Sequence, residues 1–315
     1  MSLDEPTTAL LAQLADSGTP ALHEMTPEQA RGLGTALAEL YGAGPDMARV
    51  DNVRAGPVPI RVLVPDDTCT GILVYYHGGG WTVGTIDEFD TLGRILARRT
   101  GCAVALVDYR LAPEHRYPAA VDDAWTGLLW VSQHVRDIAA SDVPLIVAGD
   151  SAGGGLAAIM ARRARDEGGP DIAMQVLVCP VTDCDLDTPS YVDPVNQLIV
   201  GRETMTWFWG HYLPDTSLRV GADASPLRVA DLSNLPPAVV LTAEHDVLRD
   251  EGERYAQRLH DARVPVLHRR FHGQMHDFFL FVNVLPGSAE GIDFAGEAIE
   301  KHLAETADQP RTAHA

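Results

Sequence analysis

The stretch Pro144-Leu-Ile-Val-Ala-Gly149-Asp150-Ser151-Ala152-Gly153-Gly-Gly-Leu decides the fold of this chain. Its first part is a short apolar run typical of a buried strand, and its last part opens a small-residue segment with helical periodicity. Between them, Gly149 to Gly153 fits the pattern G-x-S-x-G, in which a sharp turn lifts a serine hydroxyl out of a sheet. The glycines prevent side-chain clashes in the turn, and the helix N-terminus points N–H groups at a developing anion. This context favours Ser151 as a nucleophile over an ordinary glycine-rich connection.

Outward from this turn, short β-rich runs alternate with longer segments of helical periodicity. The expected strands are Val58–Val64, Gly71–Tyr76, Ala103–Val107, Leu145–Ala148, Met174–Val178, Val239–Thr242 and Val264–Arg270. Apolar strands that alternate with helices indicate a mostly parallel sheet covered on both faces. The sequence therefore predicts an α/β fold.

Two segments do not fit this alternation. Thr26-Pro27-Glu28-Gln29 combines an N-cap, a proline at the first helical position and a glutamine that closes a capping box, so we expect a helix to begin there. About 60 residues separate Val178 from Val239, more than one crossover helix requires. This insert contains an aromatic cluster. The cluster is interpreted either as a helix packed on the core or as a lid lining an apolar pocket, and both interpretations remain open.

Composition excludes several classes of protein. The 315 residues include 46% apolar and 22% charged residues, which supply a core and exclude global disorder. The 24 Lys and Arg against 44 Asp and Glu give a net charge of −20, which disfavours nucleic acid and anionic lipid as partners. No run approaches the roughly 18 apolar residues that span a membrane, and Met1 to Ala15 lacks the features of a secretory signal. We therefore expect a cytoplasmic protein without membrane insertion. The length by itself allows either one domain or two.

A triple-glycine segment, His77-Gly78-Gly79-Gly80-Trp81, directly follows the expected strand Gly71–Tyr76. Consecutive glycines cost backbone entropy, and the functional reason for them is that bare N–H groups can approach a substrate carbonyl oxygen closely. A phosphate-binding loop is disfavoured because neither G-x-G-x-x-G nor a following Lys-Ser/Thr is present. We expect His77 to anchor the loop by hydrogen bonds and not to act as the base.

A serine nucleophile needs a general base and a carboxylate that orients the base. Asp246 follows the expected strand near Ala243, and His276 follows the expected strand Val264–Arg270, in the chain order Ser, Asp/Glu, His. Spacing leaves alternatives open: Glu244, Asp250 or Asp277 as the acid, and His245 or His272 as the base. A metal site on His268, His272 and His276 is disfavoured because Pro265, Gly273 and the strand character of this segment argue against a shared helical face.

Together, the motifs resemble the hormone-sensitive-lipase-like family of α/β-hydrolase carboxylesterases, from about Thr26 to Leu303. The resemblance rests on His77–Trp81, Asp108-Tyr-Arg-Leu-Ala-Pro-Glu-His115, Gly149–Gly153, Asp246-Val-Leu-Arg-Asp-Glu-Gly252 and Gly273-Gln-Met-His276-Asp-Phe278. The sequence departs from the family pattern at Arg116 and Val247, where Pro is common, and at Asp277, where Gly is common. Asp277 places a second carboxylate beside the base. We expect Arg110 and Glu114 to form a structural pair and Asp150 to support the turn at Ser151.

The resemblance implies that Ser151 is the nucleophile, Asp246 the acid and His276 the base. It also implies oxyanion donors at the backbone N–H groups of Gly78, Gly79 and Ala152. Residues 1–315 are expected to form one α/β-hydrolase domain, with a helical cap from about 1–50 and 186–222. Aromatic residues expected to line the substrate pocket are Trp81, Trp207, Phe208 and Trp209.

The function implied by the resemblance is hydrolysis of short- to medium-acyl esters through an acyl-serine intermediate. Family members often form homodimers, and no metal or organic cofactor is implied. Two alternatives remain open at this point. One is an amidase or carbamate hydrolase with the same triad, and the other is a non-catalytic ligand-binding receptor on a hydrolase scaffold.

Overall fold

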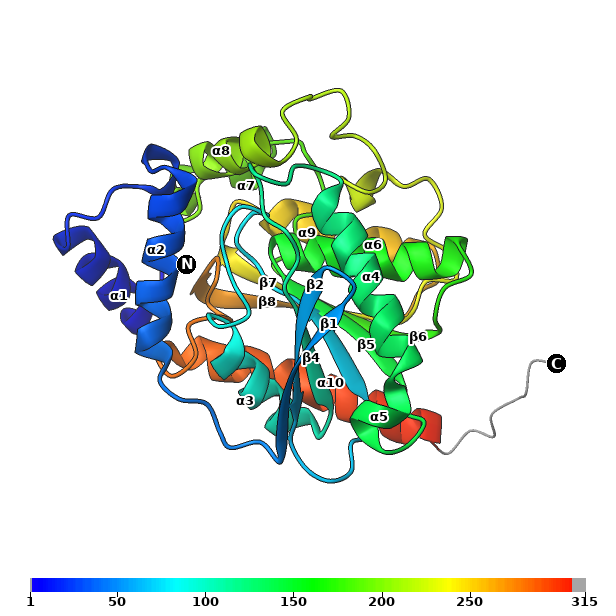
Figure 1. Ribbon diagram of the computed structural model, residues 1–315. Coiled ribbons are helices and arrows are strands. Elements are labelled where there is room, and N and C mark those ends of the chain that lie inside the picture. Colours follow the sequence, from blue (N-terminus) through cyan, green and yellow to red (C-terminus); the bar gives the residue numbers. More distant parts are fainter. Residues whose placement is uncertain (1, 308–315) are drawn as a thin grey trace.

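The computed structural model describes residues 2–307, and its strands form one central sheet flanked by helices (Figure 1). The strands are β1 Arg49–Ala55, β2 Val58–Val64, β3 Ile72–Tyr76, β4 Ala103–Val107, β5 Leu145–Asp150, β6 Ile172–Val178, β7 Ala238–His245 and β8 Val266–Met275. Their order across the sheet is β1-β2-β4-β3-β5-β6-β7-β8. The β1–β2 and β2–β4 pairs are antiparallel, and the other pairs are parallel. The predicted α/β fold with a mostly parallel sheet is confirmed.

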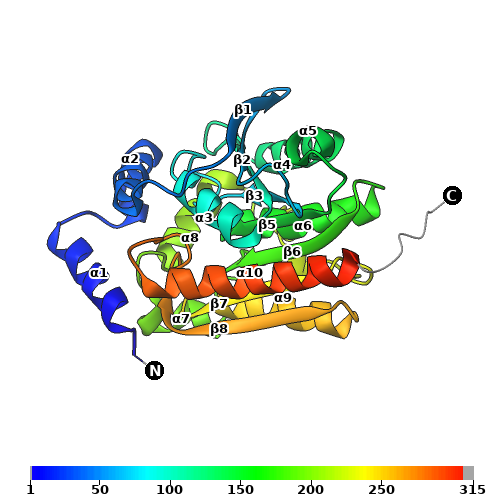
Figure 2. The same ribbon diagram turned by 90° about the horizontal axis from the view of Figure 1, so that it is seen from below.

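Helices cover both faces of this sheet, as the apolar strands predict. The helices are α1 Glu5–Asp16, α2 Pro27–Ala38, α3 Asp90–Thr100, α4 Ala119–Gln133, α5 Val135–Ala139, α6 Ala152–Asp166, α7 Pro189–Val192, α8 Arg202–Tyr212, α9 Arg249–Asp261 and α10 Pro286–Ala307. Ile72, Val74 and Tyr76 of β3 pack in one buried cluster with α4, α6 and α9. Leu73 and Tyr75, which alternate with them, pack in a second cluster with α3 and α10. Figure 2 shows α10 running along its face of the sheet.

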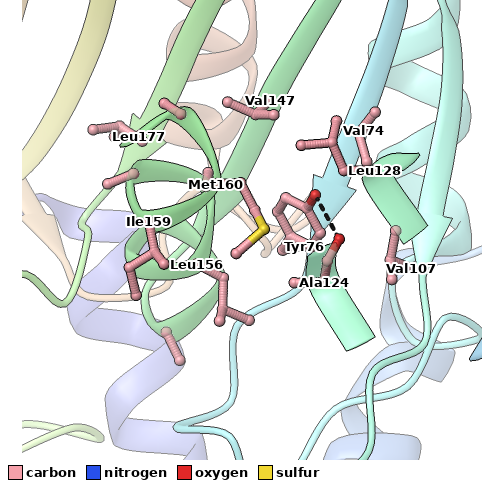
Figure 3. Packing of buried hydrophobic residues seen from close by; sticks show 14 of the residues in the cluster. Val74, Tyr76, Val107, Ala124, Leu128, Val147, Leu156, Ile159, Met160 and Leu177 are labelled. Atoms are coloured by element: carbon pink, nitrogen blue, oxygen red, sulfur yellow. Dashed lines mark hydrogen bonds between the residues drawn. The ribbon is translucent and has the colours of Figure 1, made fainter. Parts of the chain in front are cut away.

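The first cluster holds the strand ends in place beneath the functional loops. Figure 3 shows Tyr76 between side chains from α4 and α6, including Leu128 and Met160. The Tyr76 hydroxyl donates a hydrogen bond to the Ala124 carbonyl oxygen at 3.2 Å, so its buried oxygen is satisfied. Burying each large apolar side chain stabilises the fold by roughly 1.5–3 kcal/mol. This packing makes the C-terminal ends of β3 and β5 a rigid platform.

The first strand, β1, is absent from the sequence-based prediction. It forms a hairpin with β2 through Gly56, which has a φ of 58°. As an edge strand it carries polar residues and is mostly exposed, so it lacks the apolar run by which the other strands were identified. The turn Ala55-Gly56-Pro57 is the signal that could have indicated it.

The two segments outside the alternation meet in the folded chain. The helix predicted at Thr26 is α2, with the capping box formed between Thr26 and Gln29 and Pro27 at its first position. The long insert carries α7 and α8 instead of a strand. His23, in the turn before α2, lies 3.0 Å from Glu203 of α8, and Figures 1 and 2 both place these helices on the same side of the molecule. Within residues 2–307, no helix combines the length and the apolar character that crossing a bilayer demands.

Candidate active site

Ser151 occupies a strained turn between β5 and α6. Its φ of 53° and ψ of −121° are rarely adopted by residues other than glycine, so the surrounding structure must hold them. Two hydrogen bonds do so: the Ser151 N–H donates to Val178 O at 2.8 Å, and the Val181 N–H donates to Ser151 O at 2.9 Å. A Cβ atom on Gly153 would lie 1.9 Å from the Tyr76 carbonyl oxygen. Glycine is therefore required here because the first turn of α6 contacts the end of β3.

The structure brings Ser151, His276 and Asp246 into one hydrogen-bonded chain. His276 Nε2 lies 3.0 Å from Ser151 Oγ, and His276 Nδ1 lies 2.8 Å from Asp246 Oδ2. Asp246 is fully buried after β7, and its Oδ1 accepts the Leu248 N–H at 2.8 Å. His276 is 3% exposed and directly follows β8. This geometry allows His276 to accept the serine proton while Asp246 fixes the orientation of the ring.

Most of the alternative acids and bases lie in other environments. Glu244 Oε2 accepts the Gly273 N–H and lies 3.3 Å from His272. Asp250 accepts the Ser190 N–H. Of the alternative acids, Asp277 is the one beside the base, with its Oδ1 3.4 Å from His276 Nε2. His268 and His272 belong to the strand β8, so they share no helical face with His276.

Two carboxylates act on the His276 ring. Burial opposes protonation of His276, but the charges of Asp246 and Asp277 outweigh burial and raise the pKa of the imidazole. Burial also raises the pKa of Asp277, while His276 lowers it. The pair therefore favours the imidazolium that forms when a serine proton is transferred.

Cys179 adjoins this chain and was not identified from the sequence as part of the site. Its sulfur, a carboxylate oxygen of Asp246 and a ring nitrogen of His276 all lie within 4.8 Å of one another. Burial raises the pKa of the Cys179 thiol to about 12, so it stays protonated. Its position directly after β6, at the edge where β5 and β7 also end, is the signal that could have placed it.

The glycine loop after β3 differs from expectation at Gly78. The Gly78 N–H donates to Asp150 Oδ1 at 3.0 Å, so this group is engaged within the protein. Among the described residues, the N–H groups of Gly79, Gly80 and Ala152 have no hydrogen-bond partner. The expectation of Gly78 as an oxyanion donor therefore does not fit this geometry, whereas Gly79 and Ala152 remain available and Gly80 joins them.

Asp150 links the loop to the turn at Ser151. Its Oδ1 accepts hydrogen bonds from the Tyr75 hydroxyl at 2.8 Å and from Gly78. Its Oδ2 is buried and has no hydrogen-bond partner among residues 2–307. Burial, opposed by the Tyr75 hydrogen bond, raises the pKa of Asp150 to about 7. Asp150 thus holds Gly78 beside the nucleophile, consistent with the supporting role expected from the sequence.

His77 has the contacts of an anchoring residue. Its Nδ1 lies 2.7 Å from the Gly78 carbonyl oxygen, and its ring stacks on Tyr109 with a centroid distance of 4.2 Å. Burial lowers the pKa of His77 to about 4, so the ring is neutral at physiological pH. It makes no contact with Ser151 that would allow base catalysis.

The four aromatic residues assigned to a substrate pocket lie mainly in the core. Trp81 is 3% exposed and stacks on Tyr212 at 4.2 Å, and Trp209 is fully buried beside it. Phe208 packs against Gly80, where a Cβ atom would lie 2.2 Å from the ring. Trp207 is half-buried and packs edge-on against Phe208. Their main observed contacts join α8 to the glycine loop.

The expected pair of Arg110 and Glu114 is wrong. Arg110 makes a bidentate salt bridge with Asp123, whereas Glu114 pairs with Arg31 of α2 at 2.7 Å. Arg31 also donates to the Thr82 and Ala112 carbonyl oxygens. Sequence spacing could not reveal the partner of Glu114 because Arg31 lies far from it along the chain. The result is that α2 is fastened to the segment following the glycine loop.

Known proteins are similar to this chain in sequence and in fold. A family model described as alpha/beta hydrolase fold matches residues 73–280, which include Ser151, Asp246 and His276. The carboxylesterase NlhH of Mycobacterium tuberculosis is 39% identical over 254 residues, covering 78% of this chain and 79% of that protein. Ethyl acetate hydrolase of Pseudomonas putida is 36% identical over 253 residues, with the same coverage of 78% and 79%. The solved esterase of Pyrobaculum calidifontis superposes with a TM-score of 0.88 at 36% identity, covering 96% of this chain and 99% of that one.

Proposed function

Because the chain belongs to the hormone-sensitive-lipase-like family of α/β-hydrolase carboxylesterases, we propose that Ser151, His276 and Asp246 hydrolyse short- to medium-acyl esters. The observation that carries the assignment of residues is the chain of hydrogen bonds of 3.0 and 2.8 Å from Ser151 through His276 to Asp246. It is supported by the strained backbone at Ser151, which the surrounding hydrogen bonds maintain.

The reaction proceeds in two acyl transfers, first to Ser151 and then to water. Ser151 Oγ attacks the ester carbonyl carbon while its proton passes to His276 Nε2, which gives a tetrahedral oxyanion. As the intermediate collapses, the bond to the alcohol oxygen breaks, His276 returns the proton to that oxygen, and an acyl-serine remains. Water then attacks the acyl carbon, His276 accepts the water proton and returns it to Ser151, and the carboxylic acid leaves.

Backbone N–H groups stabilise the oxyanion. Gly79, Gly80 and Ala152 are the donors in this proposal because their N–H groups have no partner among residues 2–307. Ala152 contributes from the first turn of α6, where the helix dipole adds to the effect. Asp150 holds the loop through Gly78, so Gly78 acts by positioning its neighbours.

The N-terminal segment and the insert together form the cap in this proposal. The His23–Glu203 contact joins them, and Arg31 fastens α2 to the loop region. Trp207, the half-buried member of its aromatic cluster, remains the candidate for contact with substrate. We also propose a cytoplasmic enzyme that forms a homodimer, for which the edge strand β8 offers an unpaired side. Size-exclusion chromatography with light scattering measures the oligomeric state.

The test is the variant Ser151→Ala, with Ser132→Ala of α4 as the matched control. Loss of the nucleophile should reduce p-nitrophenyl acetate hydrolysis by about 10⁴-fold or more, whereas the control should hydrolyse normally. A fluorophosphonate probe should label the wild type and the control but not Ser151→Ala. Folded wild-type protein that the probe leaves unlabelled would favour the receptor alternative over an esterase.

A further inference from the structure

A cavity of about 110 Å³ lies between α2 and the glycine loop. Gly78 and Gly79 line one side of it, α2 lines another, and the segment following His276 closes it. A cavity of this size accepts one small substituent rather than a whole ligand. Because it adjoins the loop assigned to the oxyanion, a substituent of a bound ester can reach it.

Three carboxyl groups line this small space: those of Asp150, Glu88 and Asp277. Asp150 is 4% exposed with Oδ2 unpartnered among the described residues, Glu88 is 8% exposed, and the Asp277 side chain is 24% exposed. The lining contains no lysine or arginine within residues 2–307. Burial raises the pKa of each of the three acids. Burying ionised carboxylates without a fixed cation costs free energy, and a cationic ligand would offset that cost.

Aromatic rings accompany the acids. Tyr41 is 3% exposed and packs edge-on against Phe281 with a centroid distance of 5.9 Å, and Phe89 also belongs to the lining. Tyr41 lines the same cavity as the three acids. Burial raises the pKa of the Tyr41 hydroxyl, and the charges of Asp277, Glu88 and Asp150 raise it further. Carboxylates together with aromatic rings form the environment that recognises ammonium groups.

Asp277 shows which part of an ester faces the cavity. Its Oδ1 lies 3.4 Å from His276 Nε2, the nitrogen that returns a proton to the departing alcohol oxygen. Asp277 therefore adjoins the place of the departing alcohol oxygen and also lines the cavity. This position points to the alcohol part of the ester as the part that faces the cavity.

We propose that this cavity binds an ammonium group on the alcohol part of the substrate, so that esters of amino alcohols are the preferred substrates. The inference rests on the proposed esterase function. The net charge of −20 adds long-range attraction for cationic substrates.

The test compares acetylcholine with 3,3-dimethylbutyl acetate, which has the same acyl group and shape but carries carbon in place of the charged nitrogen. Wild-type kcat/KM should be about tenfold or more higher for acetylcholine. This ratio should fall towards one in Asp277→Asn and in Glu88→Gln. Glu28→Gln, which removes one charge from the exposed face of α2, should keep the wild-type ratio. Asparagine tolerates the φ of 65° at position 277, so the first variant keeps its backbone.

Choline and its neutral isostere 3,3-dimethylbutanol provide a second measurement as inhibitors of p-nitrophenyl acetate hydrolysis. Choline should compete more strongly in the wild type, and the two should become equal in Asp277→Asn. Equal kcat/KM for the two acetates in the wild type would overturn the inference while leaving the esterase function intact. A wild type that hydrolyses neither these acetates nor p-nitrophenyl acetate would overturn both. A ratio that falls equally in Glu28→Gln would assign the preference to overall charge and not to the cavity.

Discussion

The Oδ1 atom of Asp277 lies 3.4 Å from Nε2 of His276, the nitrogen that also faces Ser151 Oγ at 3.0 Å. The imidazole therefore has a carboxylate at each end, since Asp246 contacts Nδ1. Both charges favour the protonated ring, which cannot accept the serine proton. The second carboxylate thus moves the pH at which the base becomes active.

The variant Asp277→Asn should shift the pH dependence of activity. Without the second carboxylate the pKa of His276 falls, so the neutral base persists to more acidic solution. The acid limb of kcat/KM for p-nitrophenyl acetate should move to lower pH. Glu28→Gln, an exposed acid on α2, serves as the control for general charge and should leave the limb in place. An unmoved limb in Asp277→Asn would contradict the electrostatic role of Asp277.

The variant Asp246→Asn should lose about 10⁴-fold in kcat. If the asparagine oxygen still accepts the hydrogen bond from the Leu248 N–H, the asparagine amide nitrogen faces His276 Nδ1 and donates a hydrogen bond to it. The ring proton then sits on Nε2, which can no longer accept the serine proton. Circular dichroism and steady-state kinetics would show a folded but inactive enzyme. A larger loss in Asp277→Asn than in Asp246→Asn would reassign the acid.

The variant Asp150→Asn should change how stability depends on pH. In the folded state the pKa of Asp150 is raised to about 7, so the folded protein keeps this proton at pH values where the unfolded chain releases it. The free energy of unfolding of the wild type therefore falls as pH rises through that window, by an amount on the order of a few kcal/mol. Asparagine keeps the acceptor for Gly78 and Tyr75 but does not titrate. Urea unfolding at several pH values should show that the free energy of unfolding of Asp150→Asn rises relative to that of the wild type towards alkaline pH. The same pH dependence of this free energy in both proteins would refute the prediction.

Gly153→Ala should destabilise the protein, with Gly210→Ala as its matched control. The added methyl at position 153 would lie 1.9 Å from Tyr76 O and 2.5 Å from His77 O, which forces the end of β3 to move. The expected cost is about 3 kcal/mol or more. At Gly210 of α8 no atom lies within 4 Å, and alanine should stabilise the helix by about 0.5–1 kcal/mol. Equal urea midpoints for the two variants would contradict the close approach.

Local sequence patterns were sufficient to predict most helices and strands of the fold. The runs that became β2 and β4 were predicted with the bounds seen in the structure, because β4 is a continuous apolar run and β2 is rich in β-branched residues. The helix at Pro27 was predicted because its capping box is a local interaction. The edge strand β1 was missed because it buries little surface and so carries little pattern.

The sequence by itself determined most of the strands, the turn at Ser151 and the order of the groups that follow β7 and β8, since each depends on neighbours along the chain. Only the tertiary structure decided which N–H group of the glycine loop is engaged, because Gly78 and Asp150 are brought together by the parallel pairing of β3 with β5. It likewise decided that Arg31 pairs with Glu114, and that Asp150, Glu88 and Asp277 share one cavity. Contacts between distant segments depend on packing geometry, which no local pattern encodes.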